Sequence, residues 1–243
     1  MSSSPTIEPV ARRSLSDAVF RQLCDRIVAD DFAPGAPLPA ERALCEAFGV
    51  NRGALREALK RLDQARLVAV RHGGATAVRD WREDAGLDLL PELLADAAGG
   101  VEPEVVRSVM EMRSALAPEV ARQAARRGGP ALGPALARCL AELRAAGSPR
   151  ERQAAALAFW SELVRECGNL AYRLAFNSLR ESYARFMDVL TDVMRDEFDD
   201  LAGYQAIAAA VAARDGEAAR REARALVDRG EARVAAVLAE LAP

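Results

Sequence analysis

Hydrophobic residues recur every three or four positions in two segments of the first third of the chain. The segments are residues 40–48 and 52–64, and this period is typical of amphipathic helices. Gly49 can supply the left-handed conformation that ends the first helix, and Asn51 is a strong N-cap for the second. The pattern therefore predicts two short helices joined by a tight turn.

Two short runs rich in β-branched residues follow, at residues 67–71 and 76–79. They are separated by His72-Gly73-Gly74-Ala75, which predicts a β-hairpin with a glycine-rich tip. Because Gly73 and Gly74 carry no side chain, this tip can approach a phosphate or a minor groove.

Beyond a polar connection at residues 79–84, the pattern is helical to the end of the chain and contains no strand. The expected helices are 87–97, 102–127, 133–146, 149–167, 169–194, 199–214 and 217–241. The sequence thus predicts a mostly α protein, in which an N-terminal winged helix-turn-helix with a small β-hairpin wing precedes an all-helical bundle. The expected domains are 1–79, a linker with a short helix at 80–100, and a bundle at 101–243 that can enclose a ligand cavity.

Length and composition agree with two globular domains, since 243 residues exceed one typical domain and 51% of them are hydrophobic. The four cysteines lack CxxC spacing, which argues against a zinc knuckle or a disulfide framework. Three of them are expected to be small buried residues, namely Cys24, Cys45 and Cys139, and the fourth is Cys167. No apolar run reaches membrane-spanning length and the first residues lack the core of a signal peptide. We therefore expect a cytoplasmic protein.

The net charge of −3 is unevenly distributed. Residues 1–82 carry 13 basic and 10 acidic side chains, whereas the remainder carries 20 and 26. A basic first domain on an acidic second domain suits a protein that docks on nucleic acid with one domain.

Three cations of the second predicted helix, Arg52, Arg56 and Lys60, form a stripe beside its leucines. Two arginines one turn apart near a helix N-terminus can meet guanine O6 and N7 in a major groove. A solvated basic face on an ordinary helix is the alternative interpretation.

The segment PGAPLPAERALCEAFGVNRGALREALKRLDQARLVAVRHGG resembles the winged helix of the GntR family of bacterial repressors. The coinciding positions are Pro34-Gly35, Leu38-Pro39, Glu41-Arg42, Gly49-Val50, Arg52, Arg56-Glu57-Ala58-Leu59 and Leu67-Val68. The resemblance implies that Arg42, Arg52 and Arg56 contact bases or nearby phosphates, with His72 and Gly73 at the wing tip. The resemblance also places Asn51 and Gly53 at the DNA. Family members often carry Ser or Thr just after the turn, whereas this chain has Asn51, Gly53 and Ala54, so phosphate contacts from hydroxyl groups are in doubt there.

The helical half is similar to the FCD domain of the FadR subfamily within this family. The matching segments are Val106–Ala121, Phe159–Asn169 and Ala212–Arg220. Most FCD domains hold a divalent metal with an aspartate and three histidines. The matching positions in this chain are Ala156, Trp160, Tyr204 and Leu226, and His72 is its only histidine. Because these residues cannot replace imidazole and carboxylate ligands, we expect no metal, and a site built from carboxylates alone is the remaining alternative.

The branch of the subfamily without metal includes the fatty-acyl-CoA-responsive regulators, whose wing and linker resemble HGGATAVRDWREDAGLDLLPELL. The resemblance implies an apolar bundle centre and a long-chain fatty acyl-CoA as effector, with an organic or sugar acid as the alternative. Arg113 matches a common FCD arginine and is the candidate contact for effector phosphates or carboxylate, unless it lies at the surface or in a buried salt bridge. Trp160 and Tyr204 are candidate pocket walls or core residues, and Asn169 is an effector contact or a helix cap.

We expect a homodimeric transcriptional regulator that reads a double-stranded operator with two-fold symmetry, because one small winged helix makes too few base contacts. The effector would lower operator affinity by shifting the population of conformations. The helical half has no histidine, GxSxG motif, phosphate loop or paired cysteines, so we expect no enzyme and no cofactor. An architectural DNA-binding protein without an effector is a third possibility.

Overall fold

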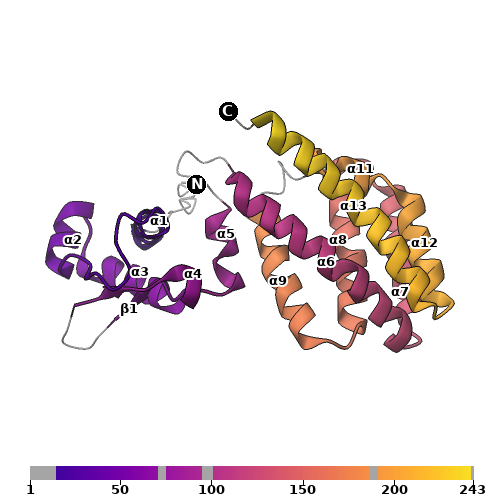
Figure 1. Cartoon of the computed structure of the whole chain (residues 1–243), viewed down its shortest axis with the longest axis horizontal. Helices are drawn as coiled ribbons and strands as arrows, with labels where there is room; N and C mark the ends of the chain where they lie inside the picture. Colours follow the sequence, from indigo (N-terminus) through magenta and orange to yellow (C-terminus); the bar gives the residue numbers. More distant parts are fainter. Residues whose placement is uncertain (1–14, 71–74, 95–100, 186–190, 242–243) are drawn as a thin grey trace, which may run out of the picture. The chain divides into compact units, whose positions relative to one another are not determined.

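The computed structural model describes residues 15–70, 75–94, 101–185 and 191–241. The chain divides between Glu92 and Leu93 into two units, which are described separately below (Figure 1). Most of the segment expected as a linker, 80–100, therefore groups with the first unit.

Within residues 15–70 and 75–94, the structure shows three helices, a two-stranded sheet and three short helical turns. In order they are α1 (Leu15–Val28), α2 (Glu41–Phe48), α3 (Arg52–Gln64), β1 (Val68–Ala69), β2 (Ala77–Val78), α4 (Trp81–Asp84), η1 (Leu87–Leu89) and α5 (Leu90–Leu93). α1 packs against α3, and Arg61 of α3 both pairs with Asp17 and lies 4.2 Å over the ring of Phe20. These contacts fix α3 on the helix that precedes it.

The predicted turn between α2 and α3 is confirmed. Gly49 has a φ of +63°, and the backbone N–H of Val50 donates to the carbonyl of Cys45 across 3.1 Å. The side chain of Asn51 then accepts from the N–H of Ala54 at 2.9 Å and begins α3. The two helices are thus set by a left-handed cap followed at once by an N-cap.

The wing is a short antiparallel pair in which Val68 faces Val78. The segment of β2 is also paired on its other edge. The N–H of Val78 donates to the carbonyl of Ala36 at 2.9 Å, and the N–H of Leu38 donates to the carbonyl of Thr76 at 2.8 Å. The strands are shorter than the predicted runs 67–71 and 76–79. His72 and Gly73 lie outside the described residues.

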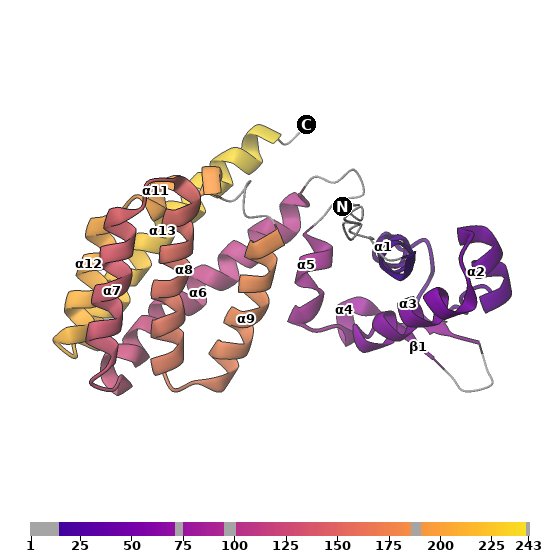
Figure 2. The same cartoon turned by 180° about the vertical axis from the view of Figure 1, so that it is seen from behind.

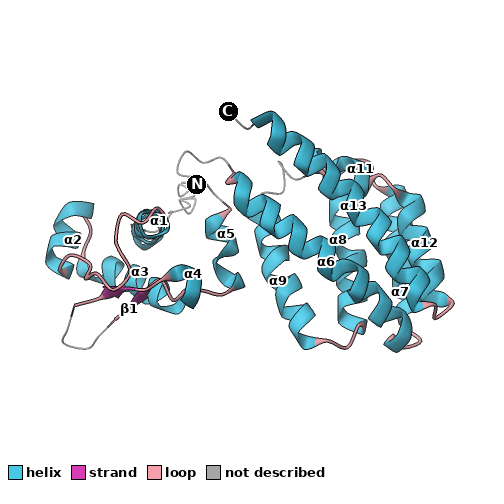
Figure 3. Cartoon of the chain, in the orientation of Figure 1, coloured by secondary structure: helices cyan, strands magenta, loops and turns pink. Residues whose placement is uncertain are grey.

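The second unit is a bundle whose described residues include no strand (Figures 2 and 3). Its helices are α6 (Pro103–Arg127), α7 (Leu132–Ala145), α8 (Pro149–Glu166), α9 (Leu170–Arg185), α11 (Arg195–Phe198), α12 (Leu201–Ala212) and α13 (Gly216–Leu241). The long helices α6 and α13 pack side by side, and α8 contacts α6, α7, α9 and α11.

Several sequence-based boundaries were wrong. α11 lies where no helix was predicted, and α4 forms within the expected polar connection because Asp80 caps it by accepting from the N–H of Arg82. The expected helix 87–97 begins as the 3-10 turn η1 and continues as the short α5. Cys24 and Cys139 are buried as expected, whereas Cys45 is half-exposed.

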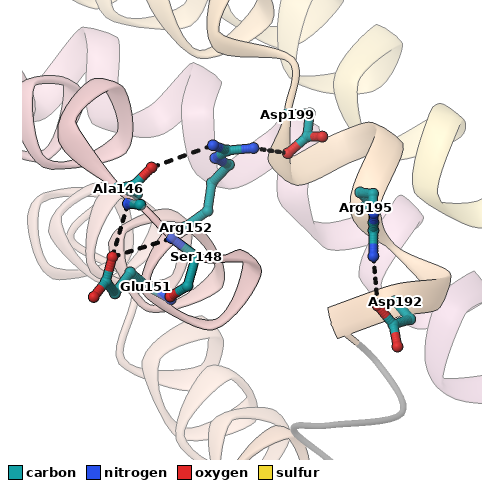
Figure 4. A network of polar contacts seen from close by, with 8 residues as sticks. Ala146, Ser148, Glu151, Arg152, Asp192, Arg195 and Asp199 are labelled. Carbon is teal, nitrogen blue, oxygen red and sulfur yellow. Dashed lines mark hydrogen bonds and ion pairs between the residues drawn. The ribbon is translucent and has the colours of Figure 1, made fainter.

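A polar network ties the start of α8 to α11 (Figure 4). Ser148 and Glu151 form a reciprocal capping box, which orients the first turn of α8. In the same turn, Arg152 pairs with Asp199 and donates to the carbonyl of Ala146 at 3.3 Å. Asp199 immediately follows α11, so this network holds that short helix against the bundle.

Candidate nucleic-acid interface and ligand pocket

α3 separates its leucines from its cations as predicted. Leu55, Ala58 and Leu62 are fully buried, whereas Arg52 and Arg56 are exposed, as is Lys60. Because the apolar side is held in the core, the cationic side is the part of α3 available to a nucleic acid.

Two of the arginines expected at the DNA are held by carboxylates of α2. Arg56 donates from Nε to Oε2 of Glu41 at 3.0 Å, and Arg42 lies 3.6 Å from Glu46. Both pairs are exposed, so they stabilise the fold little and can exchange for phosphate or base contacts. Glu41 matched the family in the sequence, but its pairing with Arg56 was not predicted, although its place beside Arg42 in the helix-turn-helix motif was a usable signal.

Gly53 has a structural role beside the helix cap. A Cβ at this position would lie 3.2 Å from Oδ1 of Asn51, the atom that accepts from Ala54. Gly53 therefore leaves space for the side chain of Asn51 to cap α3. The expected DNA contacts of both residues stay predictions.

A cavity of about 60 Å³ lies in the second unit. Its walls come from α6, α8 and α9, with Phe198 of α11, and they are mainly aliphatic and aromatic. Among the described lining residues, Arg113 is the charged one. Such an apolar pocket with one convergent charge is typical of a site for a ligand with an apolar body and an anionic group.

The structure brings two of the four expected effector residues to this cavity. Arg113 and Trp160 line it, together with Ala156 one turn before Trp160. The indole N–H of Trp160 is buried and has no hydrogen-bond partner within the described part of the chain. A ligand acceptor would satisfy this donor.

The other two expected residues lie elsewhere. Tyr204 is fully buried and packs edge-to-face on Phe159, with ring centroids 5.1 Å apart, so it is a core residue rather than a wall of this cavity. Asn169 caps α9, since its Oδ1 accepts from the N–H groups of Ala171 and Tyr172 at 3.0 and 3.2 Å.

Arg113 also makes a buried ion pair, an alternative that the sequence left open. It pairs with Oε1 of Glu197, which is fully buried on α11, while the arginine side chain is 11% exposed. Burial raises the pKa of Glu197 and nearby Asp200 adds to this, whereas Arg113 acts in the opposite direction. Sequence reasoning missed Glu197, because its partner is 84 residues away.

The residues at the positions matched to metal ligands do not fit a metal. Ala156 and Trp160 line the apolar cavity, and Tyr204 and Leu226 are buried core residues. Among the described residues, no cluster of three or more His, Cys, Asp or Glu side chains could hold an ion. Within the same ranges, no helix is long and apolar enough to cross a membrane.

Comparisons with known proteins match both units. Residues 15–78 match the model of the bacterial regulatory proteins of the gntR family, and residues 108–229 match the FCD domain. The HTH-type transcriptional regulator Mce2R of Mycobacterium tuberculosis is 39% identical over 232 residues, 96% of each chain. A fatty acid metabolism regulator protein of Edwardsiella ictaluri is 34% identical over 169 residues, 67% of this chain and 66% of that one.

A solved structure also shares the fold. It is that of Lar, described as controlling the expression of the Listeria monocytogenes agr system, and it superimposes with a TM-score of 0.61 at 16% identity. The match covers 94% of this chain and 100% of the Lar chain.

Proposed function

The chain belongs to the GntR family of bacterial regulatory proteins and carries an FCD domain, so it is a DNA-binding transcriptional regulator and not an enzyme; from this premise we propose that a long-chain fatty acyl-CoA controls its affinity for DNA. We further propose that it acts in the cytoplasm, as a homodimer on an operator with two-fold symmetry. Each winged helix offers only a few cations from α3, and pairing two half-sites adds their free energies of binding.

The cavity beside Arg113 is the observation that supports this effector class. Its apolar walls match an acyl chain, and the guanidinium can bind a phosphate or carboxylate through two parallel hydrogen bonds. Trp160 supplies a buried donor beside the same space. The fatty acid metabolism regulator of Edwardsiella ictaluri supports the same class, since it shares 34% identity with this chain.

The size of the cavity indicates how such a ligand would act. A volume of about 60 Å³ is well below that of common ligand sites, which range from about 300 to 1,000 Å³. An acyl chain must therefore enlarge the space between α9 and its neighbours α6 and α8. This enlargement gives the ligand a differential affinity for two conformations of the bundle, as control at a distance requires.

A small organic or sugar acid is the second candidate, and the same volume favours it. A short carboxylate bound to Arg113 needs less space than an acyl chain and no hydrophobic tail. The two candidates differ in whether the length of the apolar chain affects binding.

The experiment measures release of DNA by fluorescence anisotropy, with a duplex that the protein itself has selected from a random pool. We expect micromolar palmitoyl-CoA to release the duplex, and free CoA, acetyl-CoA and succinate to leave it bound. Release by succinate but not by palmitoyl-CoA would favour the second candidate. If none of these compounds releases the duplex, effector control by either class is contradicted.

A further inference from the structure

The candidate anion contact in the cavity is already occupied by an anion of the protein. Arg113 lines the cavity from α6, and its Nη2 donates to Oε1 of Glu197 on α11. Glu197 does not line the cavity itself, although the next residue, Phe198, does. The pair therefore joins the ligand pocket to a fully buried carboxylate.

The carboxylate of Glu197 fits closely against α13. A Cβ at Gly230 would lie 2.1 Å from Oε2 of Glu197, so only a glycine leaves space for this oxygen. Oε2 has no hydrogen-bond partner among the residues that the structure describes. One oxygen is thus held by Arg113, and the other lies close to Gly230 with no donor in the described part of the bundle.

Two ion pairs hold the residues that directly follow this carboxylate. Arg152 of α8 pairs with Asp199, and Arg229 of α13 pairs with Asp200 at 2.6 Å (Figure 4 shows the first). These contacts keep α11 against α8 and α13. These pairs restrain movement of Glu197 away from the bundle.

We propose that Glu197 takes the place of the effector anion in the ligand-free protein, and that ligand binding transfers one proton from solvent to its carboxylate. The inference rests on the proposed function, because it concerns the same pocket and an anionic effector. The ligand anion takes the hydrogen bonds of Arg113, and the only new covalent bond is the O–H bond of Glu197.

Charge balance gives the reason. The Arg113–Glu197 pair is neutral, and a second anion at Arg113 would leave an unpaired carboxylate in a buried site. Such a charge is costly, and buried carboxyl groups neutralise by binding a proton. Once Arg113 binds the ligand anion, the remaining influences on Glu197 favour its protonated form. Asp200 repels the negative charge of the carboxylate, and burial penalises that charge.

The proposal predicts a specific pH dependence of ligand affinity. While Glu197 is ionised in the free protein, each bound ligand takes up one proton, so affinity rises about tenfold for each unit by which the pH falls. A glutamine at this position mimics the protonated acid. The Glu197→Gln variant should therefore bind the ligand more tightly and without the proton.

The test is titration calorimetry of palmitoyl-CoA at pH 8 in phosphate and in Tris, whose ionisation heats differ. At this pH the phosphates of CoA stay ionised. We expect the wild type to take up about one proton more than Glu197→Gln, and the variant to bind at least tenfold more tightly. Glu119→Gln is the matched control, because Glu119 is also paired with an arginine of the bundle but has a pKa of about 2. It should keep the wild-type proton uptake.

The outcomes separate the two proposals. Wild-type binding with no more proton uptake than in Glu197→Gln, or weaker binding by that variant, would overturn this inference and leave the effector assignment intact. Failure of both proteins to bind palmitoyl-CoA between pH 6 and 8 would overturn the effector assignment and this inference with it. If Glu197→Gln does not fold, the wild-type affinity at pH 7 and 8 decides: a tenfold difference supports the inference and equal affinities overturn it.

Discussion

Arg56 of α3 donates from Nε to Oε2 of Glu41 of α2 across 3.0 Å, which joins the two helices of the DNA-binding motif. Both side chains are exposed, so the pair contributes little to stability. Its effect is to fix the direction of a guanidinium that stands beside exposed Arg52 on the same helix. In the DNA-free protein, the guanidinium of Arg56, which we expect to contact bases, is therefore already oriented.

The first prediction concerns the two arginines of α3. Arg52→Ala and Arg56→Ala should each weaken operator binding by about 1 to 3 kcal/mol and relax base preference, because each would remove a proposed bidentate guanine contact. Lys60→Ala should weaken all duplexes alike, since a cation farther along α3 is better placed for phosphate. Anisotropy titrations against the selected operator and single mismatches measure both effects. Unchanged specificity in both arginine variants would show that α3 is not the reading helix.

The second prediction concerns Glu41. Glu41→Gln should leave the free energy of unfolding within about 1 kcal/mol of wild type, because the pair with Arg56 is exposed. It should raise affinity for unrelated DNA at low salt and reduce discrimination between operator and mismatch, since a negative charge that would repel phosphate is lost and Arg56 is less restrained. Glu46→Gln, which releases Arg42 instead, is the matched comparison. Equal discrimination in Glu41→Gln and wild type would contradict the orienting role.

The sequence was sufficient for elements whose causes are local. α3 begins at Arg52 and ends at Gln64, as predicted, because a cap at Asn51 and leucines at helical spacing act within one segment. The same holds for the left-handed end of α2 at Gly49. These signals involve neighbours in the chain and need no knowledge of tertiary packing.

The ligand pocket depends on distant contacts, and there the sequence was only partly sufficient. Arg113 and Trp160 were found through a family resemblance, and the structure brings both to one cavity. Tyr204 was a candidate on the same basis, but its ring packs on Phe159 inside the core. Glu197 gave no periodic or motif signal, because its partner is 84 residues away and its own helix has a single turn.

The third prediction is a change of stability with pH. Burial raises the pKa of Glu197 above its ordinary value, so the folded state binds this proton more tightly than the unfolded state. The stabilisation is complete below the unfolded pKa and is lost as the pH rises through the folded pKa. Urea unfolding of the wild type from pH 4.5 to 8 should show this loss, and Glu197→Gln should not. A parallel pH dependence in both proteins would contradict the raised pKa.

The fourth prediction is that the purified protein contains no stoichiometric zinc, nickel or manganese. The positions matched to the usual ligands hold Ala156, Trp160, Tyr204 and Leu226, which offer no imidazole or carboxylate. Elemental analysis after dialysis measures the metal content. One equivalent of metal per chain that survives brief chelation would contradict it.

The last prediction tests the apolar part of the pocket. Each buried methylene contributes about 0.8 kcal/mol, so acyl-CoA affinity should rise about fourfold for each added carbon until the enlarged cavity is full. A series from octanoyl- to palmitoyl-CoA, titrated against the protein–operator complex, measures this slope. Affinities independent of chain length would favour the small-acid effector.

Trp160 gives the matched pair of variants for this series. Trp160→Asp should abolish release by palmitoyl-CoA while operator binding persists, because it places an unpaired carboxylate beside the acyl chain. Trp160→Phe should keep the dependence on chain length, since it keeps an apolar aromatic wall, although it removes the indole N–H and has a smaller ring. Circular dichroism of both variants establishes that the bundle is folded. If palmitoyl-CoA still releases a folded Trp160→Asp protein from the operator normally, the acyl chain must bind elsewhere. A buried charge in contact with the acyl chain would weaken its binding.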